Sequence, residues 1–352
     1  MAYTTINKSS SFMNTKLYTG NDGTGRSITG VGFQPDFVWV KDISNAFDHG
    51  LFDAVRGATK ALNSNDTSAE DTISNSLTAF GSDGFTAGAN AIINGNNNNY
   101  ASWNWKANGA GSANTDGSIS STVSANTTSG FSIVKYTGTG VAGTVGHGLG
   151  AVPKMFMIKD LTSSNDWQVY TNATGNNQKM HLNLTSAAAS SGNFNSTTPT
   201  SSVFSISAGG QVNTNYSNYI TYCFSDVQGF SKFGNYTGNA NADGPFIYTG
   251  FKPAFVILKN STGGGQWIII DNKRQGETVG GNARSGALST SAIEASSTAI
   301  EAGASSGLVD ILSNGFKILQ TNADFNASGA TYIYMAFGQT LVGTNNVPAN
   351  AR

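Results

Sequence analysis

Three lysine pairs are the first residues whose types and spacing suggest chemistry. Lys41-Asp42, Lys159-Asp160 and Lys259-Asn260 each close a short apolar run that begins with a proline. A lysine next to a carboxylate can act as an acid–base pair when burial shifts its pKa. The pair returns three times in the same local sequence, which is typical of a structural repeat. We therefore interpret the lysines as the polar end of a repeated central strand.

A glycine pattern and the histidines are the next candidates. Residues 138–143 (GTGVAG) match the dinucleotide-binding pattern, but the sequence that follows, TVGHGLGAVP, cannot form the helix that would receive a pyrophosphate. The histidines are scattered, and His49 occupies the repeat position where Trp167 and Trp267 stand. We interpret position 49 as a packing or surface site and not as a ligand. The sequence predicts no cofactor and no metal site.

Nucleophiles and paired acids give no stronger signal. Cys223 lies between Tyr222 and Phe224 in an aromatic strand, where a cysteine is most often a small core residue. The aspartates that could form an acid pair all occupy repeat positions: Asp42, Asp53, Asp160 and Asp271. We predict no catalytic residue, and a tailspike-type glycoside hydrolase, which needs two facing carboxylates, is the least favoured alternative.

An asparagine-rich segment is the preferred candidate for contact with a ligand or a partner chain. Amide side chains can pair with sugar hydroxyls or with a neighbouring chain, and this segment is irregular. The tryptophans, by contrast, all fall on repeat strands, where core packing is the default. The candidate residues are Asn94, Asn96, Asn97, Asn98, Asn99 and Tyr100.

The repeat predicts the elements that position these residues. Residues 35–42 (PDFVWVKD), 153–160 (PKMFMIKD) and 253–260 (PAFVILKN) are apolar on both faces, which indicates a central strand covered on both sides. A second apolar run follows each of them and is predicted to be its hairpin partner. Each repeat opens with a Tyr-Thr-Gly turn signal and closes with an aromatic strand. We therefore predict an all-β fold of three tandem antiparallel β-sandwiches, of jelly-roll or concanavalin-A-like type.

Composition supports this fold class. Charged residues make up 11% of the 352 residues, against roughly 25% in ordinary domains, while 43 glycines supply turns. The net charge is −1, without a lysine or arginine cluster, which argues against nucleic-acid binding. No run is apolar and long enough for insertion into a membrane, and the first residues lack the apolar core of a signal peptide. We expect synthesis in the cytoplasm.

The repeats set the expected boundaries. We also expect a short helix within an insertion in the third repeat, at residues 291–307. The predicted parts are an N-terminal arm at 1–16, repeats at 17–106, 130–228 and 229–340, a Ser/Gly/Asn-rich linker at 107–129, and a C-terminal tail at 341–352.

Several stretches carry a resemblance to a known family. They are FSIVKYTG at 131–138, GHGLG at 146–150, GFSKFGNYTG at 229–238, DGPFIYTGFKP at 243–253 and DFNASGATYIYMAF at 324–337. These stretches resemble a repeat family of marine and other environmental bacteriophages. Its members are described as virion structural or tail-fibre-like proteins with concanavalin-A-like β-sandwich domains.

The resemblance implies a location in the virion and a structural role, as a fibre, a head decoration or a tail appendage. Its implied partners are other virion proteins and further copies of the chain, in a trimer or a ring, with a host-surface glycan as an additional contact. The alternative is a glycan-binding module that acts as a receptor-binding protein.

Overall fold

The computed structural model describes residues 4–274, 292–301 and 308–338, and it is all-β. Antiparallel strands build every sheet of the described residues, and their α-helices are three four-residue segments. No helix among these residues is long and apolar enough to span a bilayer. The sequence-based prediction of an antiparallel all-β protein is therefore confirmed.

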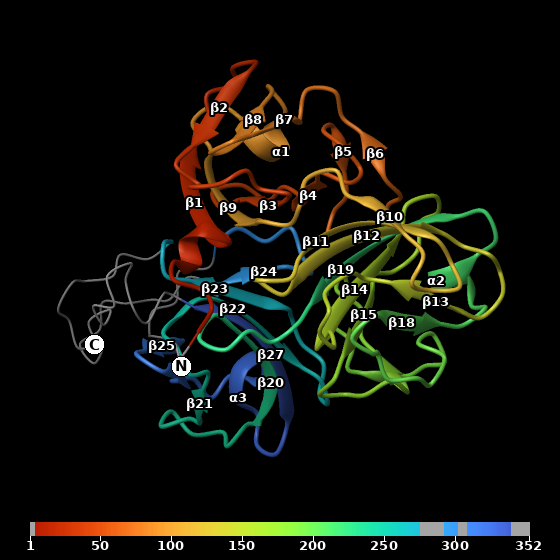
Figure 1. The fold of residues 1–352 in the computed structure, drawn as a ribbon. Helices are drawn as coiled ribbons and strands as arrows, with labels where there is room; N and C mark the ends of the chain where they lie inside the picture. The colour runs from red at the N-terminus through yellow and green to blue at the C-terminus, as the bar shows by residue number, and fades with distance from the viewer. Residues whose placement is uncertain (1–3, 275–291, 302–307, 339–352) are drawn as a thin grey trace.

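The main sheet of each repeat contains four strands in the same order (Figure 1). These four are the whole sheet in the first repeat, and they are part of a six-stranded sheet in the second and a five-stranded sheet in the third. The opening strand pairs with the closing aromatic strand, which pairs with the proline-block strand, which pairs with its hairpin partner. The order is β1 (Met13–Thr19), β9 (Asn99–Trp105), β3 (Phe37–Asp42), β4 (Gly50–Asp53) in the first repeat. It is β12 (Phe131–Thr137), β19 (Asn218–Phe224), β14 (Met155–Asp160), β15 (Gln168–Thr171) in the second. It is β20 (Ser231–Thr237), β27 (Thr331–Gly338), β22 (Pro253–Asn260), β23 (Ile268–Asp271) in the third.

A small sheet and a one-turn helix accompany each main sheet. In the first repeat they are β2 (Arg26–Thr29), β7 (Leu77–Gly81), β8 (Gly84–Ala87) and α1 (Ala91–Asn94). In the second they are β13 (Gly143–Gly146), β18 (Val203–Ile206) and α2 (Gly210–Asn213). In the third they are β21 (Phe246–Tyr248), β25 (Val309–Leu312), β26 (Gly315–Ile318) and α3 (Ala323–Asn326).

Short two-residue strands complete the first two repeats. They are β5 (Lys60–Ala61) with β6 (Asp71–Thr72), and β16 (Gln178–Lys179) with β17 (Ala189–Ser190).

The proline-block strands are buried on both faces, as predicted, because each face packs against a different core. In β3, Phe37 and Trp39 contribute to a core shared by all three repeats, whereas Val38 and Val40 pack into a core that belongs to the first repeat alone. The strands β14 and β22 divide their side chains in the same way. The alternation of apolar and polar residues that is typical of a half-exposed strand is therefore absent, because both faces of these strands are apolar.

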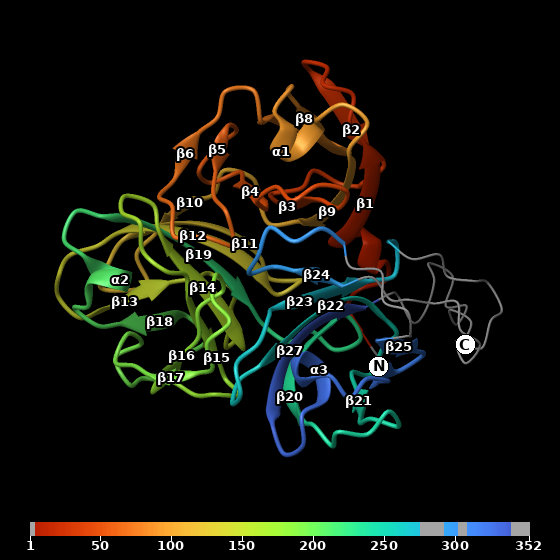
Figure 2. The same cartoon turned by 180° about the vertical axis from the view of Figure 1, so that it is seen from behind.

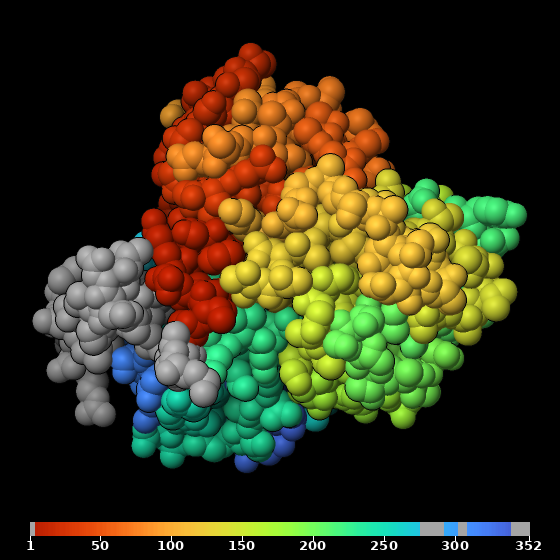
Figure 3. Space-filling model, in the orientation of Figure 1, coloured from red at the N-terminus to blue at the C-terminus, as the bar shows by residue number. Residues whose placement is uncertain are grey.

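Three register-equivalent aromatic residues meet at the centre of the shared core. The ring centroids of Trp105, Phe224 and Phe337 form a triangle with sides of 6.4, 5.8 and 6.0 Å. Each ring comes from the closing strand of a different repeat, so a pseudo-threefold axis passes between them. Figures 1 and 2 show the three repeats arranged around this centre, and Figure 3 shows them as three lobes of one body.

Three segments differ from the sequence-based expectation, because each of them pairs with a strand of a main sheet. The predicted arm is part of the fold: Met13 to Lys16 pair with β9, and Ile6 is 1% exposed in the shared core. The predicted linker carries β10 (Ser112–Asn114) and β11 (Ser121–Asn126), which extend the second sheet beside β12. Backbone pairing to an existing strand orders these Ser- and Asn-rich residues despite their low strand propensity.

The helix expected at 291–307 is absent from residues 292–301, where β24 (Ile293–Glu294) pairs with β23 instead. Residues 291 and 302–307 lie outside the described residues, as does the predicted tail at 341–352.

Candidate functional site

The repeated lysines join the repeats to one another. Lys41, Lys159 and Lys259 are fully buried, and burial lowers the pKa of each to about 8. Each Nζ donates a hydrogen bond to a carbonyl of a different repeat. The bonds are Lys41 to Thr298 (3.3 Å), Lys159 to Thr67 (3.1 Å) and Lys259 to Leu184 (3.2 Å). The lysines of the first, second and third repeats thus reach the third, first and second, which closes a ring.

The residue after each lysine holds the following turn. One side-chain oxygen of Asp42 accepts hydrogen bonds from the backbone N–H groups of Ser44 and Asn45. Asp160 and Asn260 make the same pair of bonds in their repeats. An amide serves as well as a carboxylate here, because the turn requires only an acceptor. The Lys-Asp pairs therefore act in the scaffold.

Position 49 and its equivalents form a second ring of contacts. Trp167 Nε1 donates to the carbonyl of Asn63 at 2.8 Å, and Trp267 Nε1 donates to that of His181 at 2.8 Å. In the first repeat His49 has the same role, with Nε2 3.1 Å from the carbonyl of Glu294. Its Nδ1 accepts from Trp39 Nε1 at 2.9 Å, so Nε2 carries the proton of the neutral ring. His49 is thus a buried residue at a junction between repeats.

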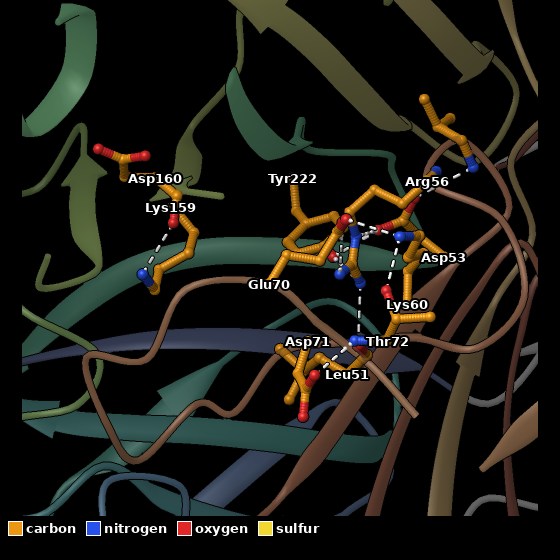
Figure 4. A network of polar contacts seen from close by, with 11 residues as sticks. Leu51, Asp53, Arg56, Lys60, Glu70, Asp71, Thr72, Lys159, Asp160 and Tyr222 are labelled. Carbon is orange, nitrogen blue, oxygen red and sulfur yellow. Dashed lines mark hydrogen bonds and ion pairs between the residues drawn. The ribbon is translucent and has the colours of Figure 1, made fainter. Parts of the chain in front are cut away.

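A buried polar cluster at the junction of the first two repeats has the residue types of an active site (Figure 4). The Arg56 guanidinium pairs with the Asp53 carboxylate and donates to the Leu51 carbonyl at 2.9 Å. The Tyr222 hydroxyl, from β19, donates to the same carboxylate at 2.8 Å. Glu70 lies 3.5 Å from Arg56 and also pairs with a half-exposed lysine, Lys60. Asp53 and Arg56 are fully enclosed.

The same cluster occurs at the junction of the third and first repeats. Arg274 pairs with Asp271 and donates to the Ile269 carbonyl at 2.8 Å, and its second partner is Glu301 at 3.4 Å. Trp103 Nε1, at the register position of Tyr222, donates to the Asp271 carboxylate at 2.9 Å. Although burial acts to raise the pKa of Asp271, its bonds to Arg274 and Trp103 hold that pKa below the ordinary value.

At the remaining junction the register-equivalent residues are Thr171, Thr174 and Met335. Where the closing strand offers a methionine, which has no proton to donate, the aspartate and arginine are both replaced by threonine. An acid is present only where a neighbouring repeat supplies a donor. We conclude that the two clusters are clamps between repeats, so Asp53 and Asp271 are engaged in structural contacts.

Two neighbouring tryptophans of β9 are expected to differ in sensitivity to replacement by phenylalanine. Trp103→Phe leaves a buried acceptor of Asp271 without its donor, so we expect it to lower the free energy of unfolding by about 2–3 kcal/mol. The Trp105 Nε1 is buried without a hydrogen-bond partner among the described residues, and the other repeats carry Phe224 and Phe337 at this position. Trp105→Phe should therefore cost less than about 1.5 kcal/mol. Urea unfolding of both variants measures the difference, and equal losses would contradict it.

The asparagine-rich candidate segment is divided between scaffold and surface. Asn94 is fully buried, and its amide donates to the carbonyls of Gly23 and Gly88. Tyr100 is also buried, and its hydroxyl donates to the carbonyl of Ala91, which closes α1. Burial raises the pKa of Tyr100 to about 12.

The remaining four residues of this segment form a turn and the first residue of β9, at the edge of the first repeat. Asn98 is half-buried and donates to Asp42 at 2.8 Å, and Asn99 accepts from Thr19 at 2.9 Å. Asn96 and Asn97 are exposed, and Asn97 has a left-handed backbone with φ of 58°. Only this pair therefore offers side chains to an outside partner without giving up an internal bond among the described residues.

The other sequence candidates lie apart from one another. Gly143 begins β13, so the glycine pattern at 138–143 leads into a strand and not into a helix. Cys223 is buried, and burial raises the pKa of its thiol. His147 and His181 are buried in the second repeat. Among residues 4–274, 292–301 and 308–338, no three His, Cys, Asp or Glu side chains gather as a metal site would require.

The surface of the described residues has shallow hollows, and two of them are of interest. One, of about 250 Å³, lies where Ser9 to Thr15 meet Ala254 and Lys273 of the third repeat. The second, of about 280 Å³, lies beside the asparagine-rich segment, between Tyr18, Ile43 and Asn99. Neither contains a pair of acids or a histidine among its lining residues.

The model of a family described as a domain of unknown function (DUF7483) matches residues 8–340. No curated protein and no solved structure matches the chain. The family model spans all three repeats as one unit, in agreement with the shared core.

Proposed function

The chain belongs to the DUF7483 family, and we propose that it is a non-enzymatic structural protein of a bacteriophage particle. Within the particle it is a fibre component, a head decoration or a tail appendage. The family description assigns no activity, so the proposal rests on the structure and on the resemblance of the repeats to phage virion proteins.

The closed ring of inter-repeat bonds is the observation that carries the proposal. The titratable side chains that recur in the repeats, such as Lys41, Asp42 and Asp53, are committed to holding the body together. Such use favours a rigid platform whose loops differ from lobe to lobe, since binding residues concentrate in loops on a rigid scaffold. A body with internal threefold arrangement also suits a threefold position in a particle as a single copy.

Each repeat is proposed to be a β-sandwich of the concanavalin-A-like type. Its main sheet forms one layer and its small sheet lies over the outer face, with a separate apolar core between them. The inner faces of the three sandwiches then pack on each other around the shared core.

The particle assignment is tested by localisation. Particles purified by density gradient from a phage that encodes this chain are expected to contain it at a fixed copy number, measured by quantitative mass spectrometry. Immunogold labelling of intact particles with antibody to the chain distinguishes head, tail and fibre. Absence of the chain from purified particles, with presence in the lysate supernatant, would overturn the proposal.

A receptor-binding module for glycans is the second candidate, and a specific loop favours it. This loop, at residues 214–218 of the second repeat, carries exposed neutral polar side chains next to the exposed Tyr216. A particle protein that contacts the host surface combines both functions.

A further inference from the structure

One turn position is occupied very differently in the three repeats. Asn97, Tyr216 and Gly329 are register equivalents in the loop between the one-turn helix and the closing strand. All three have left-handed backbones, with φ of 58°, 65° and 71°. Asparagine and glycine are the residues that ordinarily adopt this conformation, whereas a bulky aromatic residue is an outlier there.

The strained residue is also the most exposed of the large apolar and aromatic side chains of the described residues. Tyr216 is 82% exposed, so packing of its side chain does not compensate for its backbone conformation. A residue that costs stability and whose side chain has no hydrogen bond within the described chain points to a role outside it. The scaffold beneath tolerates the strain, because the Tyr216 N–H donates to the carbonyl of Gly138 at 2.9 Å, as Asn97 and Gly329 do to Gly20 and Gly238.

A second loop completes the surface around the ring. Gly140, also left-handed with φ of 71°, donates to the carbonyl of Asn213. A Cβ on Gly140 would lie 3.3 Å from Cβ of Asn215, so the glycine leaves room for Asn215, the residue before Tyr216. Val141 follows and is 68% exposed. In the other repeats the positions of Gly140 and Val141 hold Asp22-Gly23 and Ala240-Asn241.

The chemistry of these loops matches a neutral, hydroxyl-rich ligand. Residues 137–143 (TGTGVAG) and 213–218 (NTNYSN) contain no charged side chain, which disfavours phosphate and other ions. Exposed amides and hydroxyls, among them Asn215, Thr214 and Thr139, lie in the same two loops as the ring. An aromatic face with amide donors and acceptors at its edge suits the apolar face and the hydroxyls of a sugar ring.

We propose that this surface, the Tyr216 rim (residues 139–142 and 214–218), binds a neutral pyranose of a cell-surface glycan. The sugar ring stacks on Tyr216, and the Asn215 amide bonds its hydroxyls. The inference rests on the host-contact part of the proposed function. It moves the binding loop from the first repeat, where the asparagine-rich segment suggested it, to the equivalent loop of the second.

Replacement of Tyr216 by the residues of the other repeats tests the proposal. Saturation-transfer difference NMR on the full chain uses a mixture of methyl glucoside, galactoside, mannoside and N-acetylglucosaminide as probe. At least one pyranoside should give signal with the native chain, and Tyr216→Asn and Tyr216→Gly should weaken its binding by about tenfold or more. Tyr216→Phe should keep most of the binding. Both weakening variants should melt at or above the native temperature, because they relieve the left-handed strain.

Asn97→Gly is the matched control, since it alters the equivalent turn of the first repeat and should leave sugar binding unchanged. Signal from no pyranoside, or binding that survives Tyr216→Gly, would overturn the proposal. A change of oligomeric state in Tyr216→Gly without sugar binding would instead assign the ring to a contact between copies. Particle localisation is measured independently of sugar binding. If the chain is present in particles but binds no sugar, only the sugar site at the Tyr216 rim is overturned.

Discussion

Asp53→Ala is expected to lower the free energy of unfolding by about 3–5 kcal/mol, because it leaves the buried Arg56 guanidinium without its carboxylate. The remaining partners are the Leu51 carbonyl, the Tyr222 hydroxyl at 3.4 Å, and Glu70, which is 3.5 Å away and partly exposed. The Tyr222 hydroxyl also loses its acceptor. Chemical denaturation of the full chain at pH 7 measures the loss. Since the clamp joins two repeats, we expect the whole chain to lose stability in one transition.

The third junction supplies the matched rescue for this variant. Asp53→Thr/Arg56→Thr/Tyr222→Met installs the residue types of Thr171, Thr174 and Met335, so that no buried charge remains unpaired. Replacing a buried ion pair by neutral residues is often close to neutral, so the triple variant should be more stable than Asp53→Ala alone. Lys232→Ala, which removes a partly exposed ion pair of 3.4 Å with Asp226, should cost less than about 1 kcal/mol. A loss in Asp53→Ala no larger than in Lys232→Ala would refute the clamp.

The elements within a repeat were predictable because their signals are local. Pro153 and Lys159, for example, bracket an apolar run with a second run close behind, and these features alone specify a central strand with a hairpin partner. The closing strands were equally clear from their spaced aromatic residues. Such signals need no knowledge of distant contacts.

The arrangement of the repeats was not predictable in the same way. A strand that is apolar on both faces must be covered twice, but the pattern does not say whether the second cover is its own sheet or a neighbouring repeat. Trp39 packs in the shared core and Val38 in a private one, yet both are simply apolar in sequence. The closing contacts, such as Trp167 to the Asn63 carbonyl, involve backbone acceptors, which every residue possesses.

The candidate site shows the same limit. The segment from Asn94 to Tyr100 attracted attention by composition, but composition does not separate a buried amide from an exposed one. Alignment of the three repeats with one another does single out the loop of the second repeat, because Tyr216 is aligned with Asn97 and Gly329. The backbone conformation that makes Tyr216 exceptional became visible only in the structure.

Acid is expected to destabilise the protein through His49. Burial lowers the pKa of His49 to about 3, and the nearby positive charge of Lys41 acts in the same direction. The unfolded chain binds this proton with the ordinary pKa of 6.5, so the stability that neutral His49 supplies is complete above pH 6.5 and is lost as pH falls toward 3. The full loss is on the order of 5 kcal/mol, and about 3 kcal/mol should be gone at pH 4. The lowered pKa values of His147 and His181 act in the same direction.

A double variant that installs residues of the second repeat in the first distinguishes the effect of His49 from that of the other titrating groups. The pair Trp39 and His49 occupies the positions of Met157 and Trp167, so a large and a smaller side chain trade places. Trp39→Met/His49→Trp should fold, keep a ring N–H for the Glu294 carbonyl, and show a shallower loss of unfolding free energy between pH 6.5 and 4. His49→Trp alone should be less stable than the pair at pH 8, because two indoles overpack one junction. In the native chain, the His49 imidazole followed by NMR should remain neutral at pH 5. Protonation of His49 near pH 6.5, or an unchanged pH slope in the double variant, would contradict the assignment.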